Sequence, residues 1–384
     1  MFDDCIIMAG GLGTRLWPAS SSRLPKQFLP GPGGKSFFRA AVDRGLAVSG
    51  RIIIIAGKAH VRHVLEACDS LSGSEKARLV LIGEPLARNT APAIACGAVF
   101  AERTAGRGRK MLVLTSDHVI GPLEAFRADA EKAAALAAGA APGAAPAMVV
   151  FGIAPGRPET GYGYIEAGGG ALPLGGALSE GGCFRALSFR EKPDRETAEK
   201  FLAAGNFYWN SGMFAFDSSF ILDEFRKNEP EVLAPFEKLP VPGEGAYAAR
   251  GGIAALENWP GLEAAYGAAR AVSIDYAVAE KCRSVIMVRA GFDWFDVGSW
   301  DEYARLPAVQ GKKDADVFGA DTASSCFVDA DIPVALCGTE DLIVVIRSGR
   351  DGGPASALIA KKGETQRLKA IVEQIKAAGR TELL

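Results

Sequence analysis

The chain has 384 residues, of which 48% are apolar and 23% charged, and its formal net charge is −2. This balance is typical of a globular protein, and the length suits one large domain with a smaller one, or two comparable domains. Lysine and arginine are scattered along the chain, which argues against a surface built for nucleic acid or for an anionic membrane. Any phosphate-bearing ligand must therefore be held by a few local cations.

The sequence gives no sign of export or of membrane insertion. It opens with the acids Asp3 and Asp4, whereas a secretory signal begins with basic residues and continues with a longer apolar run. No segment approaches the roughly 18 consecutive apolar residues that a membrane span needs. The seven cysteines are widely spaced and form no Cys-x-x-Cys pair. We therefore expect reduced thiols in a cytoplasmic protein.

Short apolar runs alternate with helical patterns over the first 155 residues. The runs do not alternate with polar residues, which is typical of parallel strands buried on both faces. Helical patterns between them include residues 91–103 and 124–138. This βαβ order predicts an α/β fold with a doubly wound, mostly parallel, Rossmann-like sheet. The expected strands are residues 5–8, 52–55, 79–82, 111–114 and 148–151.

The pattern changes toward the end of the chain. Irregular passages are expected at residues 137–147, 168–182 and 240–252, where glycine, proline and alanine gather. Beyond residue 306 come short alternating strands and a closing helix, which predict a small C-terminal β-plus-helix unit. The expected boundaries are therefore a main domain over residues 1–304 and a small domain over residues 305–384. The expected elements of the latter are strands 326–328, 334–336 and 342–346 and helix 364–378.

A glycine-rich loop, Gly10-Gly11-Leu12-Gly13-Thr14-Arg15, directly follows the first strand. Ligands bind beyond the carboxyl ends of strands in open α/β sheets, and glycines let backbone N–H groups approach phosphates. The loop is not a dinucleotide fingerprint, which would need glycine where Leu16 stands, nor a P-loop, which would need Gly-Lys-Ser/Thr after four residues. Phosphate binding is the prediction, and a plain strand-to-helix turn is the alternative.

Two cations bracket the proline-rich stretch that follows the loop. Arg15 and Lys26 are separated by Trp17, Pro18 and Pro25, and the prolines prevent a continuous helix. Such a segment can fold back over a ligand and bring both cations to one triphosphate.

These residues carry a resemblance to a known family. Residues 8–20, Met-Ala-Gly-Gly-Leu-Gly-Thr-Arg-Leu-Trp-Pro-Ala-Ser, followed by Pro25-Lys26-Gln27-Phe28, resemble the nucleotidyltransferase motif of the mannose-1-phosphate guanylyltransferases. In that family the loop, the arginine and the lysine bind the triphosphate of GTP. The resemblance continues in order over about the first 300 residues. It implies the nucleotidyltransferase fold, in a short form without the isomerase domain that bifunctional relatives carry.

The resemblance extends to the segment against the nucleotide base. Asn89-Thr90-Ala91-Pro92-Ala93 resembles the family segment that lies along base and ribose, which implies nucleotide contacts for Asn89, Thr90 and Pro92. A structural explanation is also sufficient for Thr90, because it suits the N-cap of the helix that begins at residue 91, with Pro92 in the first turn.

Two aspartates are the candidate metal ligands. Asp117 follows the strand 111–114, where a carboxylate would repel a triphosphate unless a divalent cation lay between them. Asp117-His118 resembles the family's Asp-His pair, whose aspartate coordinates Mg²⁺. Residues 292–300 resemble the segment with the second such aspartate, here Asp296, for which a plain turn is the alternative. Ser299 with Glu302 predicts a helix cap.

The histidines receive no chemical role. His118 is expected to be packed or hydrogen-bonded. His60 and His63 have the spacing of a metal pair, but no third ligand follows, so a solvated helix face is expected.

Three further segments resemble the family's sugar-phosphate subsite. They are the loop around Gly161, Tyr162 and Gly163, the pair Glu191-Lys192, and Asn210. In the family the glutamate accepts sugar hydroxyls and the lysine neutralises the sugar phosphate. An amide such as Asn210 can both donate to and accept from hydroxyls.

The implied reaction is attack by a sugar 1-phosphate oxygen on the α-phosphorus of GTP, with release of pyrophosphate. The nucleophile is already an anion, so catalysis rests on alignment and charge neutralisation by Arg15, Lys26, Lys192 and Mg²⁺. GTP and mannose 1-phosphate are the expected substrates. Another sugar phosphate or nucleoside triphosphate, or a non-catalytic nucleotide-sugar sensor, are the alternatives. The small C-terminal unit leaves a homodimer contact as a hypothesis.

Overall fold

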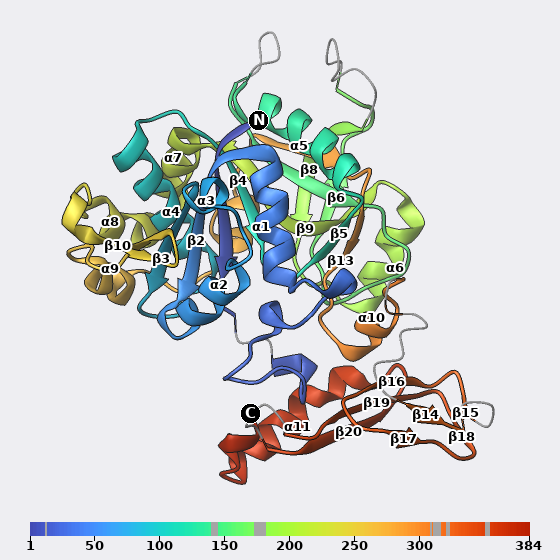
Figure 1. The fold of residues 1–384 in the computed structure, drawn as a ribbon. Helices are drawn as coiled ribbons and strands as arrows, with labels where there is room; N and C mark the ends of the chain where they lie inside the picture. The colour runs from blue at the N-terminus through green and yellow to red at the C-terminus, as the bar shows by residue number, and fades with distance from the viewer. Residues whose placement is uncertain are drawn as a thin grey trace. The chain divides into compact units, whose positions relative to one another are not determined.

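The computed structural model describes residues 1–11, 14–139, 145–172, 182–307, 309, 316–319, 323–349 and 354–384. Leu12 and Gly13 of the glycine loop lie outside these residues, as do the side chain of Thr14 and parts of the expected irregular passages at 137–147 and 168–182. The chain divides into two compact units (Figure 1). Unit 1 comprises Met1–Gly10, Ala41–Ser116 and Ile120–Trp294, and unit 2 comprises Gly11–Ala40, Asp117–Val119 and Phe295–Leu384.

Eleven of the described strands form one sheet in unit 1, in the order β10-β11-β3-β2-β1-β4-β9-β6-β12-β8-β7. The ladders from β11 through β3, β2 and β1 to β4 are parallel. The strands are β1 (Phe2–Ala9), β2 (Ser49–Gly57), β3 (Leu79–Glu84), β4 (Lys110–Thr115), β6 (Met148–Ile153), β7 (Tyr164–Ala167), β8 (Cys183–Arg190), β9 (Phe207–Asp217), β10 (Tyr247–Arg250), β11 (Ile253–Leu256) and β12 (Val285–Arg289).

The second half of the sheet is mixed. Strand β9 runs antiparallel to both β4 and β6, β8 runs antiparallel to β12 and β7, and β12 pairs in parallel with β6. The α/β fold class is thus confirmed, with more antiparallel pairing than the sequence predicts. Antiparallel pairs are made by β9 with β4, β6 and β7, by β8 with β12 and β7, and by β10 with β11. The sequence of β9, Phe-Tyr-Trp-Asn-Ser-Gly-Met-Phe-Ala-Phe-Asp, contains polar residues and glycine and so lacks an uninterrupted apolar run.

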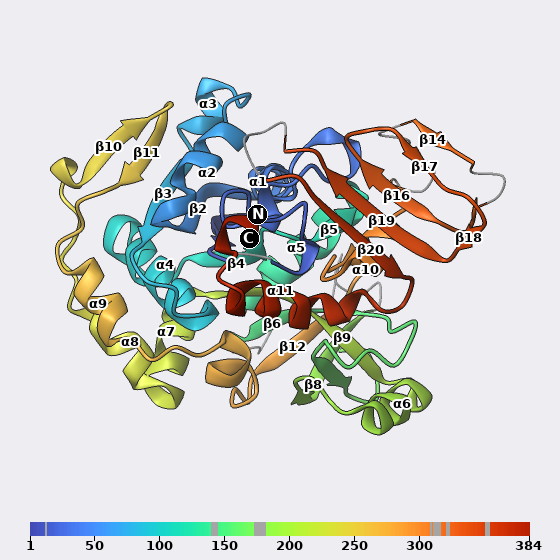
Figure 2. The same cartoon turned by 90° about the horizontal axis from the view of Figure 1, so that it is seen from below.

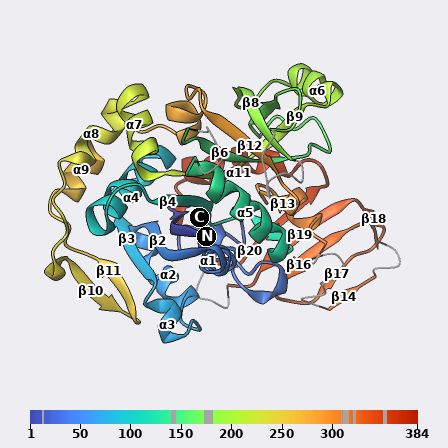
Figure 3. The same cartoon turned by 90° about the horizontal axis from the view of Figure 1, so that it is seen from above.

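Helices cover both faces of this sheet, as expected for a doubly wound fold (Figure 3). A methyl group built on Gly45 of α1 (Phe37–Val48) would lie 3.0 Å from Ile52 and 3.3 Å from Cys5. One built on Gly97 of α4 (Thr90–Ala105) would lie 2.6 Å from Ile6. Because neighbouring residues of a strand point to opposite faces, α1 and α4 lie on opposite sides of the sheet.

The α4 side holds the larger core, to which α7 (Ser218–Asn228), α8 (Pro230–Glu237) and α9 (Leu262–Ala268) contribute. The other helices of unit 1 are α2 (Val61–Ala67), α3 (Gly73–Lys76), α5 (Leu123–Ala137) and α6 (Arg195–Ala204), with single turns η4 (Lys58–His60), η6 (Glu244–Ala246) and η7 (Asp275–Ala279). The passage 240–252, expected to be irregular, contains η6 and β10. No helix in the described part of the chain is long and apolar enough to cross a bilayer.

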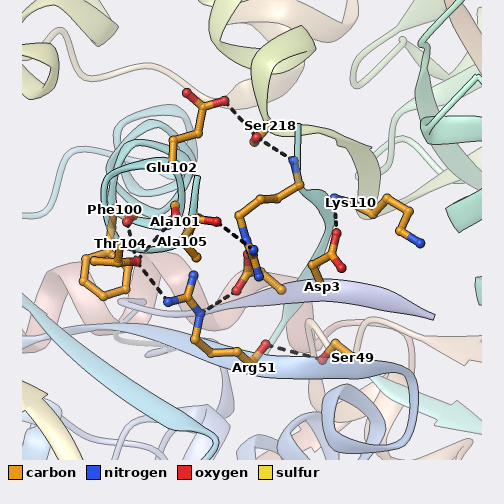
Figure 4. A network of polar contacts seen from close by, with 12 residues as sticks. Asp3, Ser49, Arg51, Phe100, Ala101, Glu102, Thr104, Ala105, Lys110 and Ser218 are labelled. Carbon is orange, nitrogen blue, oxygen red and sulfur yellow. Dashed lines mark hydrogen bonds and ion pairs between the residues drawn. The ribbon is translucent and has the colours of Figure 1, made fainter. Parts of the chain in front are cut away.

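A buried ionic network ties the strand starts to α4 (Figure 4). The fully buried Asp4 of β1 accepts from Arg51 Nε at 2.5 Å and from Arg109 Nε. Arg51 also donates to Thr104 Oγ1 of α4 at 2.9 Å. Two cations neutralise a carboxylate that would otherwise be costly to bury. The network links the starts of β1 and β2 and the residue before β4 to α4.

Unit 2 contains short, mostly parallel strand pairs and the last helix, α11 (Leu368–Ala377), shown in red in Figure 2. Its strands are β14 (Val317–Phe318), β15 (Ala323–Ser324), β16 (Phe327–Ala330), β17 (Val334–Ala335), β18 (Thr339–Glu340), β19 (Leu342–Arg347) and β20 (Ser356–Lys361). Single turns η9 (Thr365–Arg367) and η10 (Thr381–Leu383) flank α11, and α10 is Trp300–Ala304. Strands β5 (Val119–Gly121) and β13 (Asp293–Phe295) form a separate pair. The expected C-terminal strands and helix are therefore present.

The segment that follows the glycine loop belongs to this unit. Trp17 donates to the Leu383 carbonyl at 2.7 Å, and Trp300 donates to the Trp17 carbonyl at 2.8 Å. One apolar core joins Leu16, Trp17, Leu29 and Phe37 to residues of α10, β19, β20 and α11. Unit 2 thus includes three separate stretches of chain, and the expected boundary between residues 304 and 305 stays a prediction.

Candidate active site

A lysine and two aspartates from distant parts of the chain meet in unit 2. Lys26 stands at the start of η2 (Lys26–Phe28) and is only 5% exposed. Its Nζ donates to Asp117 Oδ2 at 2.8 Å and to the Asp296 carbonyl at 2.7 Å, and lies 3.9 Å from Asp296 Oδ1. The structure therefore brings three of the predicted residues, Lys26, Asp117 and Asp296, into one cluster.

His118 completes this cluster. Its buried Nε2 lies 3.2 Å from Asp296 Oδ1 and 3.7 Å from Asp117 Oδ1. The expectation of a packed, hydrogen-bonded histidine is confirmed. Burial on its own would raise the pKa of Asp296, but the hydrogen bond from His118 and the charges of Lys26, His118 and Arg15 outweigh burial and hold that pKa well below its usual range. Asp296 is accordingly an anion at neutral pH.

The backbone around the cluster is held by side chains of the same segments. Gln27, next to Lys26, donates its amide to the Gly11 carbonyl at 2.9 Å, which fixes the start of the glycine loop beside Lys26. Val297, next to Asp296, has a φ of 54°, a strained value for a β-branched residue, and is fully buried. Arg15 lies on η1 (Thr14–Leu16) and is exposed.

The helix cap predicted after Asp296 is present. Ser299 is the N-cap of α10, and its side chain accepts from the Glu302 N–H at 3.3 Å. The Glu302 carboxylate accepts from the Gly298 N–H at 2.6 Å. Ser299 and Glu302 therefore have structural roles that support the turn bearing Asp296.

The donor set of this cluster fits a magnesium ion only together with a substrate. Among the residues that the structure describes, no group of three or more His, Cys, Asp or Glu side chains is arranged to hold a metal ion. Mg²⁺ is a hard cation that is commonly bound through one or two carboxylates plus substrate phosphates. Asp117 and Asp296, which share Lys26 and His118 as neighbours, supply two such carboxylates.

A buried acid that sequence reasoning missed lies in unit 1 at the carboxyl end of β3. Glu84 is 7% exposed, and its Oε1 has no hydrogen-bond partner among the described residues. Its Oε2 would stand 2.6 Å from a methyl group built on Gly10, so a larger residue than glycine would collide with it. Burial raises the pKa of Glu84 to about 7, against the opposing effect of the Tyr266 hydroxyl.

The start of α4 differs from the expectation in one respect. The N-cap is Asn89, with a φ of 69°, whose side chain accepts from the Thr90 N–H at 2.8 Å. The N-cap role predicted for Thr90 is therefore wrong. Thr90 is the first helical residue, and its hydroxyl accepts from the Ile274 N–H at 2.9 Å. Pro92 lies buried in the first turn, as predicted.

The solvated helix face predicted for His60 and His63 is wrong for His60. His60 is 4% exposed, and its Nδ1 lies 3.4 Å from the Ala9 carbonyl. The reason is its place in η4, directly after β2, where the chain passes over the end of the neighbouring β1.

The residues predicted for the sugar phosphate gather in unit 1. The Tyr162 ring makes edge contacts with Trp209 and Trp294 at centroid distances of 5.4 and 5.2 Å. The Asn210 N–H donates to the Gly163 carbonyl at 2.8 Å, and the Lys192 N–H donates to the Tyr162 carbonyl at 3.2 Å. The loop of Gly161, Tyr162 and Gly163 is thus bonded to both Asn210 and Lys192.

In this second cluster Lys192 and Glu191 form an ion pair, and one oxygen of Glu191 stays available as an acceptor. Lys192 Nζ donates to Glu191 Oε1 at 2.8 Å, and buried Glu191 Oε2 has no hydrogen-bond partner among the described residues. Burial would lower the pKa of Lys192, but the hydrogen bond and charge of Glu191 raise it. A second missed acid, Asp275, accepts from Asn210 Nδ2 at 2.9 Å.

Comparison with known proteins identifies the family of this chain. The profile of the nucleotidyl transferase family matches residues 4–310. The xanthan biosynthesis protein XanB of Xanthomonas campestris pv. campestris is 37% identical over 98% of this chain and 74% of its own length. The mannose-1-phosphate guanylyltransferase of Escherichia coli K12 is 35% identical, again over 98% of this chain and 74% of its own. This chain belongs to the mannose-1-phosphate guanylyltransferase family.

A solved structure supports the same assignment. The match to the structure of a mannose-1-phosphate geranyltransferase from Thermus thermophilus covers 98% of this chain and 100% of that chain, with a TM-score of 0.74 and 29% sequence identity. The family and fold expected from the glycine loop and the later segments are confirmed. The roles of the individual residues stay predictions.

Glu84 and Asp275 were missed for different reasons. Glu84 stands at the end of a buried strand, as Asp117 does, so the same argument from strand ends could have found it. Asp275 could not have been found in this way, because it stands in a single turn between a loop and a strand and belongs to no periodic pattern.

Proposed function

We propose that this chain transfers the guanylyl group of GTP to mannose 1-phosphate, giving GDP-mannose and pyrophosphate. The observation that carries the proposal is the buried contact of Lys26 with Asp117 and Asp296. Phosphoryl transfer is catalysed mainly by positioned charges, and a lysine between two carboxylates beside a glycine-rich loop supplies such charges. Hydrolysis through a covalent intermediate would instead need an activated nucleophile.

The proposed cofactor is Mg²⁺, held by Asp117 and Asp296. When bound, it would neutralise charge on the phosphates around the reacting phosphorus. His118 keeps Asp296 ionised and oriented. Arg15 and Lys26, with the backbone of Gly10, Gly11, Gly13 and Thr14, would hold the triphosphate and the departing pyrophosphate.

Guanine is the base that Glu84 supports best. Guanine presents an N1–H and an N2–H₂ group on one edge, and an ionised carboxylate accepts hydrogen bonds on both oxygens. Glu84 already has one buried oxygen without a partner among the described residues. Because the pKa of Glu84 is about 7, hydrogen bonds from bound N–H donors would shift its protonation equilibrium fully to the carboxylate. Asn89, Thr90 and Pro92 would lie along base and ribose.

The sugar phosphate would be held by the second cluster. Gly161, Tyr162 and Gly163 give it room beside the backbone, Glu191 and Asn210 bond its hydroxyls, and Lys192 neutralises its phosphate. One phosphate oxygen then attacks the α-phosphorus of GTP. The bond from that phosphorus to the bridging oxygen of pyrophosphate breaks, and pyrophosphate leaves with its electron pair. No proton must be removed from the nucleophile, because the attacking phosphate oxygen is already an anion.

We also propose that the reaction takes place in the cytoplasm. All seven cysteines, which lie among the described residues, are free thiols, as a reducing compartment permits.

A panel of GTP, ATP, UTP and dTTP with mannose, glucose and galactose 1-phosphates, assayed for pyrophosphate release with Mg²⁺, tests the proposal. We expect the highest kcat/KM for GTP with mannose 1-phosphate. A higher value for another pair would reassign the substrates, and silence across the panel would favour a sensor.

Glu84→Gln tests the assignment of the base in the same assay. Replacing an anionic acceptor by a neutral amide should lower kcat/KM for GTP by roughly 10- to 100-fold and narrow the preference over ATP. Glu66→Gln, on the exposed face of α2, is the matched control. An unchanged preference for GTP in Glu84→Gln would remove Glu84 from the base subsite.

A further inference from the structure

The side chain of Asn210 is held in one orientation from two sides. Its Oδ1 accepts from the Gly212 N–H at 3.0 Å, and its Nδ2 donates to Asp275 Oδ1 at 2.9 Å. A rotation that exchanged oxygen and nitrogen would place N–H against N–H and oxygen against oxygen. One N–H of the amide therefore remains in a fixed direction for a ligand.

Asp275 is itself firmly placed. It opens η7, directly after Ile274, whose N–H donates to Thr90 at the start of α4. Two residues earlier, the Val272 carbonyl accepts from the Ala91 N–H at 3.1 Å. The segment is held again by the buried Glu229, which pairs with Arg270 at 2.9 Å and with Lys281 at 2.5 Å. Asp275 is thus anchored on both sides.

A fixed acceptor belongs to the same cluster. Glu191 Oε2 is buried and unpartnered among the described residues, and it would stand 2.1 Å from a methyl group built on Gly163. Only glycine leaves room for this carboxylate. A sugar hydroxyl is both donor and acceptor, so Glu191 Oε2 and the remaining N–H of Asn210 together select the positions of hydroxyls.

We propose that Asp275 is a positioning residue of the sugar-phosphate subsite: it fixes the Asn210 amide and so determines which arrangement of hydroxyls is accepted. This inference rests on the proposed function. Asp275 acts through Asn210, so its loss should weaken recognition of the sugar phosphate and leave recognition of the nucleotide unchanged.

The surroundings of Asp275 add a dependence on pH. Burial, and next the charge of Glu191, raise the pKa of Asp275 to about 6, while the Asn210 hydrogen bond and the charge of Lys192 oppose the shift. Glu280, at the other end of η7, also faces Glu191. Above about pH 6 Asp275 is a carboxylate and accepts from Asn210 strongly, and below it the protonated group accepts more weakly.

The test is steady-state kinetics of Asp275→Asn and Asp275→Ala with GTP and mannose 1-phosphate. Asparagine keeps a neutral acceptor for Asn210, so KM for mannose 1-phosphate should rise about tenfold, and KM for GTP should stay within about twofold. Alanine leaves the amide without its acceptor. Its KM for the sugar phosphate should rise further, and the preference for mannose over glucose 1-phosphate should fall.

The pH profile separates positioning from a general loss of packing. From pH 7.5 to 5.5 the KM of the natural chain for mannose 1-phosphate should rise more than that of Asp275→Asn. Comparing the two cancels the titration of the substrate's own phosphate, whose second pKa is near 6. Asp223→Asn, an exposed change on α7, is the control.

The outcomes distinguish the inference from the function on which it rests. If the natural chain turns over and Asp275→Asn shows an unchanged sugar-phosphate KM, or parallel rises for both substrates, the positioning role is wrong and the proposed function stands. If the natural chain turns over no sugar phosphate of the panel, both are wrong.

Discussion

Lys26 is the residue whose surroundings say most about the chemistry of this chain. Its ammonium group is buried and donates to the Asp117 carboxylate and to the Asp296 carbonyl. A buried cation of this kind is stable only because nearby carboxylates neutralise it. The carboxylate of Asp296 stays ionised because the hydrogen bond from His118 and the charge of Lys26 hold its pKa below the usual range. If the proposed function is right, Lys26 exchanges these contacts for those of a phosphate when the triphosphate binds.

Lys26→Met should retain the aliphatic stem and lose the charge. Without the positive charge of Lys26, the leaving pyrophosphate would lose its stabilisation at this position, so kcat/KM should fall by a factor on the order of 10²–10³. Pyrophosphate release measures the effect, and thermal unfolding shows whether the chain still folds. Lys369→Met, on the exposed face of α11, is the control. Activity within a few-fold of the natural chain would show that Lys26 is only a structural counter-ion.

The motifs of the sequence pointed to three residues that the structure places together, although their roles stay predictions. Lys26, Asp117 and Asp296 were all predicted, and the structure brings them together. Glu84 was not predicted although it stands at a strand end, because no motif accompanies it, and Asp275 was not predicted because it stands in a turn outside any periodic pattern. Their significance appears only when burial leaves Glu84 without a partner among the described residues and orients Asp275 toward Asn210.

At the scale of elements, continuous apolar runs predicted the strands well. β1, β2, β3, β4 and β6 all contain the expected runs. β9 was missed although it is 11 residues long, because Asn210, Ser211 and Gly212 interrupt its apolar pattern. This strand carries the predicted site residue Asn210, and it runs antiparallel to β4, β6 and β7.

Gly97 of α4 tests how closely the helices pack on the sheet. A methyl group there would meet Ile6 at 2.6 Å and Ile55 at 3.2 Å. Gly97→Ala should therefore lower the free energy of unfolding by about 1–3 kcal/mol, although alanine is the better helix former. Urea unfolding of the full chain measures the change.

Gly267 of α9 is the matched control, because a methyl group there meets nothing within 4 Å. Gly267→Ala should be neutral or stabilise by up to about 1 kcal/mol. Equal effects of the two substitutions would contradict the close contact of α4 with the sheet.

At the scale of the whole molecule, the contacts that assemble unit 2 were the hardest feature to predict from sequence, and the boundary near residue 304 stays a prediction. Unit 2 joins residues 11–40, 117–119 and 295–384, and Trp17 bonds to a residue 366 positions away. Composition changes along the chain cannot reveal such contacts, because each stretch reads as an ordinary local segment. The homodimer likewise stays a prediction that a measured mass in solution would decide.

The central claim is that the chain transfers a guanylyl group and does not hydrolyse GTP. The most direct test follows label from GTP that carries ³²P at the α-position, with mannose 1-phosphate and Mg²⁺. We predict that the label appears in GDP-mannose with one pyrophosphate released per transfer, and that Asp117→Ala and Asp296→Ala each abolish this transfer. Label that remains in GTP, or that appears in free GMP or GDP, would contradict the account.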